Sequence, residues 1–285
     1  MGVTVNHRSM FVSIIVLIVL TVCGTVTAQR LKPKLSPAEL IKRVIRNELN
    51  TPDGADVHWQ YRLNKDIDGK QETREVVETK SGSIDRLLAI AGRPLTDAQE
   101  REESARILTL SRNPDKQYKL EQAHQKDAAQ CSAFFKMIPD AFVFEDAGEK
   151  GELRILTFRP NPNFEPASRE GKVLHEMAGE IWINAKQQRF VSMNGQLINE
   201  VKFGGGLLGH LEKGGQCNVR RNEIAPGHWE VTEITVNMRG KALLFKTISV
   251  QQKELHSNFQ VVPEGLNLAD AAALLLEQTM IAAKR

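Results

Sequence analysis

The fold is decided by residues 171–262, which read GKVLHEMAGEIWINAKQQRFVSMNGQLINEVKFGGGLLGHLEKGGQCNVRRNEIAPGHWEVTEITVNMRGKALLFKTISVQQKELHSNFQVV. Short runs rich in Val, Ile, Thr, Phe and Trp alternate here with turn-forming residues, a pattern typical of consecutive antiparallel strands in a sandwich or barrel. Turns are predicted at 184–187, 212–215, 225–227 and 237–240, because each segment carries Gly, Asn or Pro where the backbone must reverse. Since strands of L-residues twist, a meander of this length is expected to curl.

Further strands are predicted upstream of this stretch. The alternation of Trp59, Tyr61 and Leu63 with polar residues indicates a half-buried strand, and segments 72–79 and 84–90 follow it after turns. Segments 142–145 and 152–159 flank a Gly-containing turn and predict a hairpin. These strands are expected to join the meander in one sheet, so the fold class is mainly β with α, an α+β domain.

Helices are predicted where a capping residue precedes an apolar periodic segment. The capping residues are Ser36, Thr96, Asn113 and Asn267. The third helix is expected to end before Pro139, and the last helix to cover 268–283. Residues 96–139 therefore form a helical excursion within the sheet-forming chain, and the helices are expected to cover the sheet.

The composition excludes one class of partner. The 285 residues contain 38 Lys and Arg against 35 Asp and Glu, a net charge of +3. This surplus is small and no Lys/Arg cluster interleaved with aromatic residues occurs, so nucleic acid is not an expected partner. The hydrophobic content of 41% can supply a core, and we expect a monomer.

The first 28 residues predict an export signal. Arg8 lies in a short polar region, an apolar run covers 11–22, and small side chains precede a predicted cleavage between Ala28 and Gln29. The mature protein is then periplasmic. Two alternatives stay open, namely an uncleaved membrane anchor facing the periplasm and a lipoprotein signal at Cys23.

Two cysteines remain in the mature chain, Cys131 and Cys217. An exported compartment permits a disulfide between them, and a buried free thiol at Cys131 is the alternative. Because no CxxC pattern occurs, neither a zinc site nor a redox motif is predicted.

A family resemblance is carried by the signal peptide and five short blocks. The blocks are Tyr61-Arg62, Glu75-Val76-Val77-Glu78, Gly92-Arg93-Pro94-Leu95-Thr96, Gly179-Glu180-Ile181-Trp182-Ile183-Asn184 and Lys202-Phe203-Gly204-Gly205-Gly206. On these blocks the chain resembles the periplasmic outer-membrane lipoprotein-sorting (LolA/LolB-like) family. Within that family it resembles a bacterial branch that has a helical excursion after the turn at residues 92–96. Asn184 stands where the family usually has Asp, and Asn serves the same turn.

The resemblance implies one LolA/LolB-like domain over residues 29–285. Its fold would be a half-open curved antiparallel β-barrel with helices covering the concave face. We therefore expect a periplasmic binding protein, not an enzyme, whose apolar cavity holds lipid or lipoprotein acyl chains in trafficking to the outer membrane. The alternative is an envelope structural or sensor protein that uses the same fold with a filled core to bind another protein.

Aromatic residues on or beside the predicted strands are candidates for the lining of a ligand cavity. They are Trp59, Tyr61, Trp182, Phe190, Phe203, Trp229 and Phe245. The alternative for each is an ordinary place in the core. The loop made of Gly204, Gly205, Gly206, Leu207 and Leu208 is a candidate flap at the cavity mouth, or a plain loop between strands.

Three motif-like patterns favour structure over chemistry. Residues 64–75 approach an EF-hand calcium loop, but their strand-like flanks favour a hairpin turn. His175-Glu176 lacks the second His of a metalloprotease motif and is predicted to lie on a strand. No Ser lies in a G-x-S-x-G context. No catalytic residue, metal site or cofactor is therefore predicted.

Overall fold

A computed structural model of the chain describes residues 35–50, 57–242 and 246–282. Residues 1–35 and 36–285 form two separate units, and the fold given below is that of the second. The predicted cleavage site at Ala28 and Gln29, the alternative site at Cys23 and the cavity candidate Phe245 lie outside the described residues.

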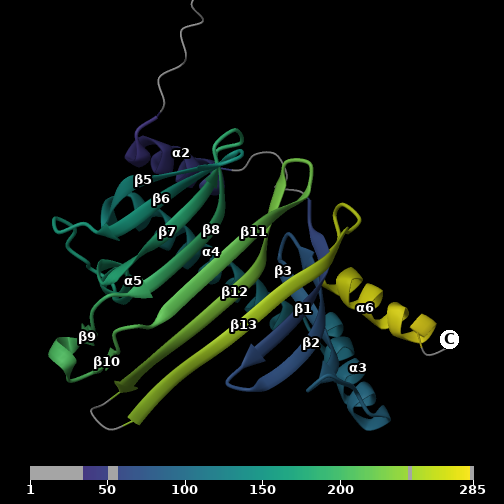
Figure 1. Cartoon of the computed structure of the whole chain (residues 1–285). Helices are drawn as coiled ribbons and strands as arrows, with labels where there is room; N and C mark the ends of the chain where they lie inside the picture. Colours follow the sequence, from purple (N-terminus) through teal and green to yellow (C-terminus); the bar gives the residue numbers. More distant parts are fainter. Residues whose placement is uncertain (1–34, 51–56, 243–245, 283–285) are drawn as a thin grey trace, which may run out of the picture. The chain divides into compact units, whose positions relative to one another are not determined.

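In the described part of the chain, thirteen strands form one antiparallel sheet (Figure 1). They are β1 (Trp59–Ile67), β2 (Lys70–Thr79), β3 (Gly82–Ile90), β4 (Arg93–Pro94), β5 (Phe142–Lys150), β6 (Leu153–Pro160), β7 (Met177–Asn184), β8 (Arg189–Leu197), β9 (Val201–Phe203), β10 (Gly209–Leu211), β11 (Gln216–Ala225), β12 (His228–Ala242) and β13 (Lys246–Val261). The order across the sheet is β4-β3-β2-β1-β13-β12-β11-β8-β7-β6-β5, and β10 joins β9 to β12. The sheet is curved and is not closed into a barrel, which confirms the predicted α+β class.

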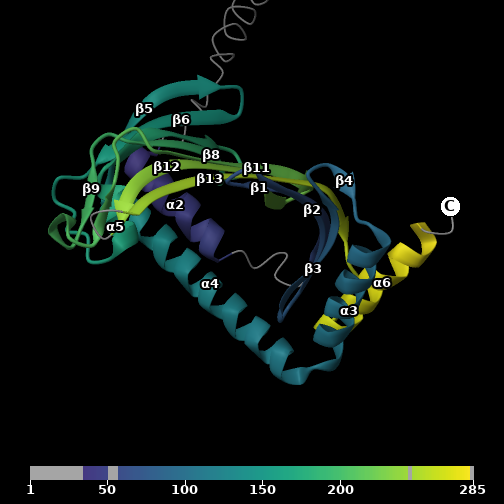
Figure 2. The ribbon, with the colours of Figure 1, turned by 90° about the horizontal axis from the view of Figure 1, so that it is seen from below.

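Five α-helices accompany the sheet in the described part of the chain. They are α2 (Pro37–Leu49), α3 (Asp97–Arg112), α4 (Pro114–Ala141), α5 (Arg169–His175) and α6 (Leu268–Ala282). Figure 2 shows α2 and α4 on the concave side of the sheet, and α3 and α6 outside its β2–β3 end. None of these helices is long and apolar enough to cross a membrane.

Local capping signals placed the helix starts correctly. Capping boxes are present at Ser36 with Glu39 and at Thr96 with Gln99. The Asn113 side chain accepts a hydrogen bond from the backbone N–H of Lys116 at 3.0 Å. These interactions satisfy backbone donors that the first helical turn leaves free, which is why the sequence alone locates them.

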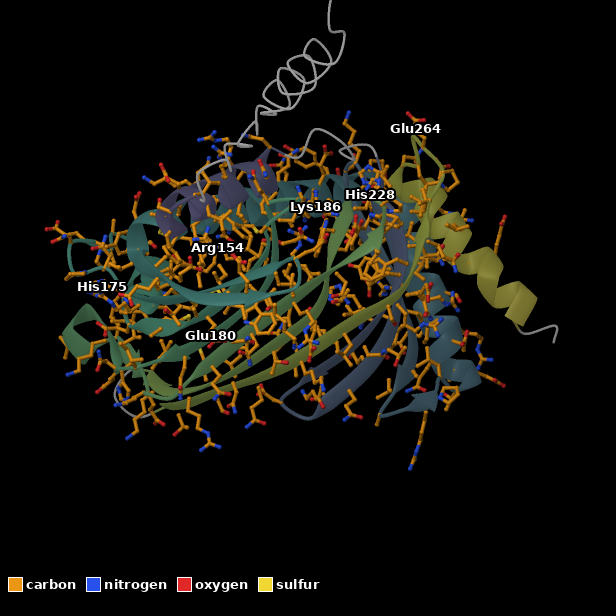
Figure 3. The ribbon with its side chains drawn as sticks, turned by 45° about the horizontal axis from the view of Figure 1, so that its top comes forward. Arg154, His175, Glu180, Lys186, His228 and Glu264 are labelled. Carbon is orange, nitrogen blue, oxygen red and sulfur yellow. The ribbon has the colours of Figure 1, made fainter. Side chains whose placement is uncertain are left out.

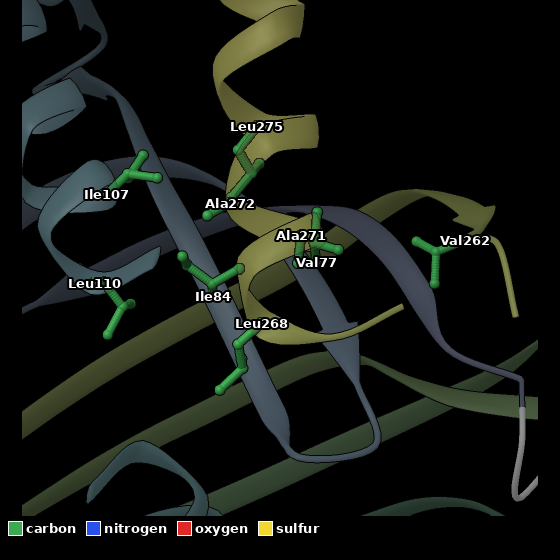
Figure 4. Close-up of a cluster of buried hydrophobic side chains, with 9 residues drawn as sticks. All are labelled: Val77, Ile84, Ile107, Leu110, Val262, Leu268, Ala271, Ala272 and Leu275. Carbon is green, nitrogen blue, oxygen red and sulfur yellow. The ribbon is translucent and has the colours of Figure 1, made fainter. Parts of the chain in front are cut away.

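The outer helices α3 and α6 are held by one hydrophobic cluster (Figure 4). It consists of Val77, Ile84, Ile107, Leu110, Val262, Leu268, Ala271, Ala272 and Leu275. Val77 and Ile84 are direct partners on β2 and β3, and the small Ala271 and Ala272 let α6 lie close against them. Helices α3 and α6 thus pack against the outer face, and the predicted cover of the concave face is provided by α2 and α4.

The predicted turn at 237–240 is wrong, because these residues lie inside β12. Gly240 serves strand pairing instead of a reversal. A Cβ atom at Gly240 would lie 2.1 Å from the carbonyl oxygen of His210, so only glycine lets β10 approach β12 this closely. The other three predicted turns of the meander separate β7 from β8, β10 from β11, and β11 from β12.

Two helix predictions are also corrected. Residues 169–175 form α5 and not a strand, because the Ser168 hydroxyl caps the helix by accepting the Gly171 N–H at 3.0 Å. Helix α4 runs through Pro139 to Ala141. Pro139 lies in the last turn, so its missing N–H removes one hydrogen bond near an end that is already frayed.

Candidate functional site

One row of cross-strand neighbours shows how the concave face changes along the sheet. From β6 to β1 the row runs Leu156, Ile181, Met193, Val219, Ile234, Glu254 and Lys65. Leu156 and Ile181 are buried, with 0% and 2% of their surface exposed. Val219 and Ile234, on the next strands along, are only half-buried. The apolar side chains on the concave face are therefore buried on β6 and β7 and only partly covered on β11 and β12.

Half-buried apolar side chains continue over the four central strands β1, β13, β12 and β11. We call this surface the concave strip, and it consists of Tyr61, Leu63, Val219, Ile234, Val236 and Phe259. Fully packed core residues of these types are normally buried. An apolar surface that stays half open on the inner face of a curved sheet is a candidate binding site.

Figure 2 shows helix α4 crossing the concave side of the sheet. Residues 122–131 are all exposed, on every side of the helix. These ten residues span about 15 Å at 1.5 Å per residue, close to the ~14 Å between the first and last of four adjacent strands. The segment has the length needed to bridge the concave strip.

Both ends of the bridging segment are attached to the rest of the protein. Leu120 and His124 lie against Gly82 of β3. A Cβ atom added at Gly82 would lie 3.4 Å from the Cβ of His124. At the other end, Ile138 is buried and the Met137 sulfur lies 4.0 Å from the Ser168 hydroxyl. Helix α4 therefore contacts the rest of the protein on both sides of this segment, and the segment between these contacts lies over a half-open apolar face.

An aromatic row borders the concave strip at β1 and β13. The Tyr61 ring stacks on His256 and on Phe259, with ring centroids 5.1 and 5.3 Å apart. The Trp59 ring meets Phe259 and His228 edge to face, at 6.3 and 5.6 Å. Of the predicted cavity residues, the structure thus brings Trp59 and Tyr61 together.

Two glutamates beside the aromatic row are held in a poorly solvated place. Burial and the neighbouring Glu230 charge raise the pKa of Glu78 to about 7, and burial also raises the pKa of Glu230. The Glu78 carboxylate accepts the backbone N–H of Trp59 at 3.2 Å. On β13, by contrast, His256 and Lys65 lower the pKa of Glu254 to about 2. The site is thus apolar on β11 and β12, whereas β13 contributes the charged Glu254 to the same face, in an ion pair with Lys65 of β1. Glu78 and Glu230 lie at its border.

The other described cavity candidates lie elsewhere. Trp182 follows Ile181 on β7 and therefore faces the outer side, where its ring meets Lys150 Nζ at 5.9 Å. Phe190 and Trp229 are buried, at 5% and 8% exposure, and the Phe190 N–H donates to Glu48 of α2 at 2.9 Å. Phe203 ends β9, which joins the sheet through β10 beside residues 240–242 of β12, beyond the strip residues of that strand.

The candidate flap is a short 3-10 turn that links β9 to β10. We call residues 204–208 the tip loop. All three glycines have positive φ, from 56° at Gly204 to 94° at Gly206, which explains why glycine is needed here. Leu207 and Leu208 remain 69% and 55% exposed, so the loop presents two apolar side chains to solvent.

A polar pocket of ≈430 Å³ lies next to the tip loop. Its lining includes Lys172, His175, Glu176, Asn199, Glu200 and Lys202. Figure 3 shows His175 and His228 far apart on the molecule. Among the described residues, no group of three or more His, Cys, Asp or Glu side chains is placed to hold a metal ion.

Phe259, Ile234 and Val219 are site residues that the sequence reasoning missed. Strand alternation alone gives each an inner or an outer face but does not say which inner positions stay uncovered. Phe259 lies beyond a bulge at Asn258, whose φ is 57°, so counting along the strand does not locate its ring. Both Cys131 and Cys217 are free thiols.

Comparisons with known proteins give little beyond this geometry. No family model matches the chain, and no curated protein matches it. A solved structure of a DUF1329 family protein from Desulfovibrio piger ATCC 29098 is similar over 83% of this chain and 98% of that chain, with 10% identity and a TM-score of 0.28. Because a TM-score this low does not establish a shared fold, neither fold nor function is argued from it. The LolA/LolB-like resemblance stays a prediction.

Proposed function

We propose that this protein is an exported carrier that binds the acyl chain of a lipid or lipoprotein on the concave strip, beneath α4. One observation carries the proposal: a helix segment exposed on all sides bridges an apolar face that is itself half open. A flexible apolar chain fits on the half-open apolar face below the helix, because each buried methylene group contributes about 0.8 kcal/mol. The role is one of binding and not of catalysis.

The proposed carrier needs a surface where a chain can pass to or from a membrane. The tip loop suits this role, because Leu207 and Leu208 are exposed and adjacent. Exposed apolar side chains on a loop can enter the interfacial region of a bilayer, where their burial is favourable. In this proposal the tip loop contacts the bilayer, and the concave strip holds the chain in transit.

The proposal is tested by titrating the exported protein with dansyl-labelled undecanoic acid and following probe fluorescence. Wild-type protein is expected to bind about one probe per chain. Ile234→Trp places an indole in the middle of the concave strip and is expected to weaken binding at least about tenfold, since the bulk occupies the space of the chain.

Thr235→Trp is the matched control. Thr235 is the next residue on β12, and its side chain projects from the opposite face. This variant carries the same new side chain and is expected to bind within about twofold of wild type. Absence of probe binding by wild type, or equal loss in both variants, would contradict the proposal.

A further inference from the structure

Three basic side chains form a row beside the tip loop. Lys202 on β9 pairs with His210 on β10, and His210 pairs with Lys241 on β12. Direct partners on antiparallel strands project from the same face of a sheet, about 5 Å apart. Lys202 and Lys241 are exposed, and His210 is half-buried between them. We call these three residues the basic row.

Folding stability does not explain the basic row. Like charges on directly paired strands destabilise a sheet, and within the described chain neither Lys202 nor Lys241 forms an ion pair. One acidic group is known to face the row: the Glu200 carboxylate lies 3.5 Å from His210 Nδ1. Residues 200–213 and 239–241 together contain four Lys and Arg against two Glu, a local excess of +2. The positive charge is therefore available to a partner.

The position of the basic row indicates what that partner is. The row adjoins the two exposed leucines of the tip loop, since β9 and β10 are the strands that this loop connects. Apolar side chains flanked by Lys and Arg favour an anionic membrane surface, where the former enter the interface and the latter meet phosphate groups. We propose that the basic row binds the phosphate groups of anionic lipids and docks this end of the sheet on an anionic bilayer.

The neighbouring pocket supplies room for a lipid headgroup. Lys202 lines both the basic row and the ≈430 Å³ pocket, in which Lys172 is a second cation. Of the acidic residues there, Glu176 accepts a hydrogen bond from Asn199 at 2.9 Å, and Glu200 faces His210. This inference rests on the proposed function, because the docked protein would exchange an acyl chain with the bilayer it contacts.

Vesicle flotation tests the inference on the exported protein. Phosphatidylcholine vesicles are compared with vesicles that also contain an equal share of phosphatidylglycerol, at 0.1 M and 1 M salt. Binding is expected to favour the anionic vesicles and to weaken at 1 M salt, where the screening length falls from about 10 Å to about 3 Å. Lys202→Glu/Lys241→Glu is expected to weaken binding at least about 25-fold, or about fivefold per lysine.

The control variant Lys70→Glu/Lys80→Glu makes the same change in net charge on β2 and its hairpin, and β2 is three strands from β12 in the sheet order. It is expected to bind anionic vesicles within about threefold of wild type. Thermal unfolding followed by circular dichroism checks that both double variants are folded.

Three results would overturn the inference: equal binding to both vesicle types, equal loss in both double variants, or no vesicle binding at all. The acyl-probe titration is done without vesicles. A protein that binds the probe but fails the flotation test therefore loses this inference and keeps the proposed function. A protein that binds anionic vesicles but not the probe loses the proposed function.

Discussion

At the scale of single residues, Glu78 predicts how stability changes with pH. Its pKa is about 7 in the folded protein against an ordinary value of 4.5. Between these values the folded state binds more protons than the unfolded state, so the contribution of Glu78 to stability is complete below pH 4.5 and is lost as the pH rises to 7. The difference corresponds to at most about 3 kcal/mol.

Glu78→Gln removes this titration and keeps an oxygen for the Trp59 N–H. The free energy of unfolding of Glu78→Gln relative to wild type is expected to rise by about 3 kcal/mol between pH 4 and pH 8, measured by urea denaturation. Glu264→Gln, at an exposed position near α6 (Figure 3), is the control and should show no such rise. A pH-independent difference for Glu78→Gln would contradict the placement of Glu78 in a poorly solvated site.

At the scale of elements, one side chain fixes α2 to the sheet. Glu48 is only 5% exposed, lies 3.4 Å from Arg189, and forms an ion pair with Arg221. It also accepts the Phe190 N–H. Glu48→Ala leaves buried cations without their partner and is expected to lower the free energy of unfolding by about 3–5 kcal/mol. Glu48→Gln keeps the Phe190 hydrogen bond and should lose less, and equal losses in urea denaturation would contradict this account.

The bridging segment of α4 gives a second prediction at this scale. Helix residues 122–131 lack tertiary burial, so their amides are expected to exchange with deuterium faster than those of β12. A bound acyl chain would pack against the segment and slow its exchange. The measurement is hydrogen exchange by mass spectrometry with and without the undecanoyl probe, and α3 serves as the internal control. Slowing confined to α3, or none in α4, would contradict the role of α4 as a cover.

Local signals predicted the elements well, and contacts between distant segments explain the errors. The capping residues Ser36, Thr96 and Asn113 act within one helical turn, so their helices were predicted correctly. Gly240 is a typical turn residue, so the local sequence predicts a turn. Its actual role is to let β10, about thirty residues earlier in the chain, approach β12 closely, and the local sequence does not show this contact. Residues 169–175 lie in a stretch that the sequence predicts as strands, but the Ser168 cap makes them helix α5.

At the scale of the whole molecule, the sheet was predictable and the site was not. Strand alternation and turn spacing predicted the curved meander, but they do not show that β1 pairs with β13. That pairing places Tyr61 beside Phe259 and His256. The sequence alone therefore could not assign Phe259 and His256 to the aromatic row. The openness of the concave strip follows from how α4 spans the sheet. Residues 122–131 carry no large apolar side chain, which indicates exposure to solvent but does not show that the segment bridges the sheet.

The central claim is that an acyl chain lies on the concave strip beneath α4. Native mass spectrometry with lipid extraction, on protein purified from an exporting host, tests it most directly. The account predicts a co-purifying acyl species at near one per chain in wild type and Thr235→Trp, and its loss in folded Ile234→Trp. Wild-type protein with no bound species, which also takes up no added fatty acid or lipopeptide, would contradict the claim.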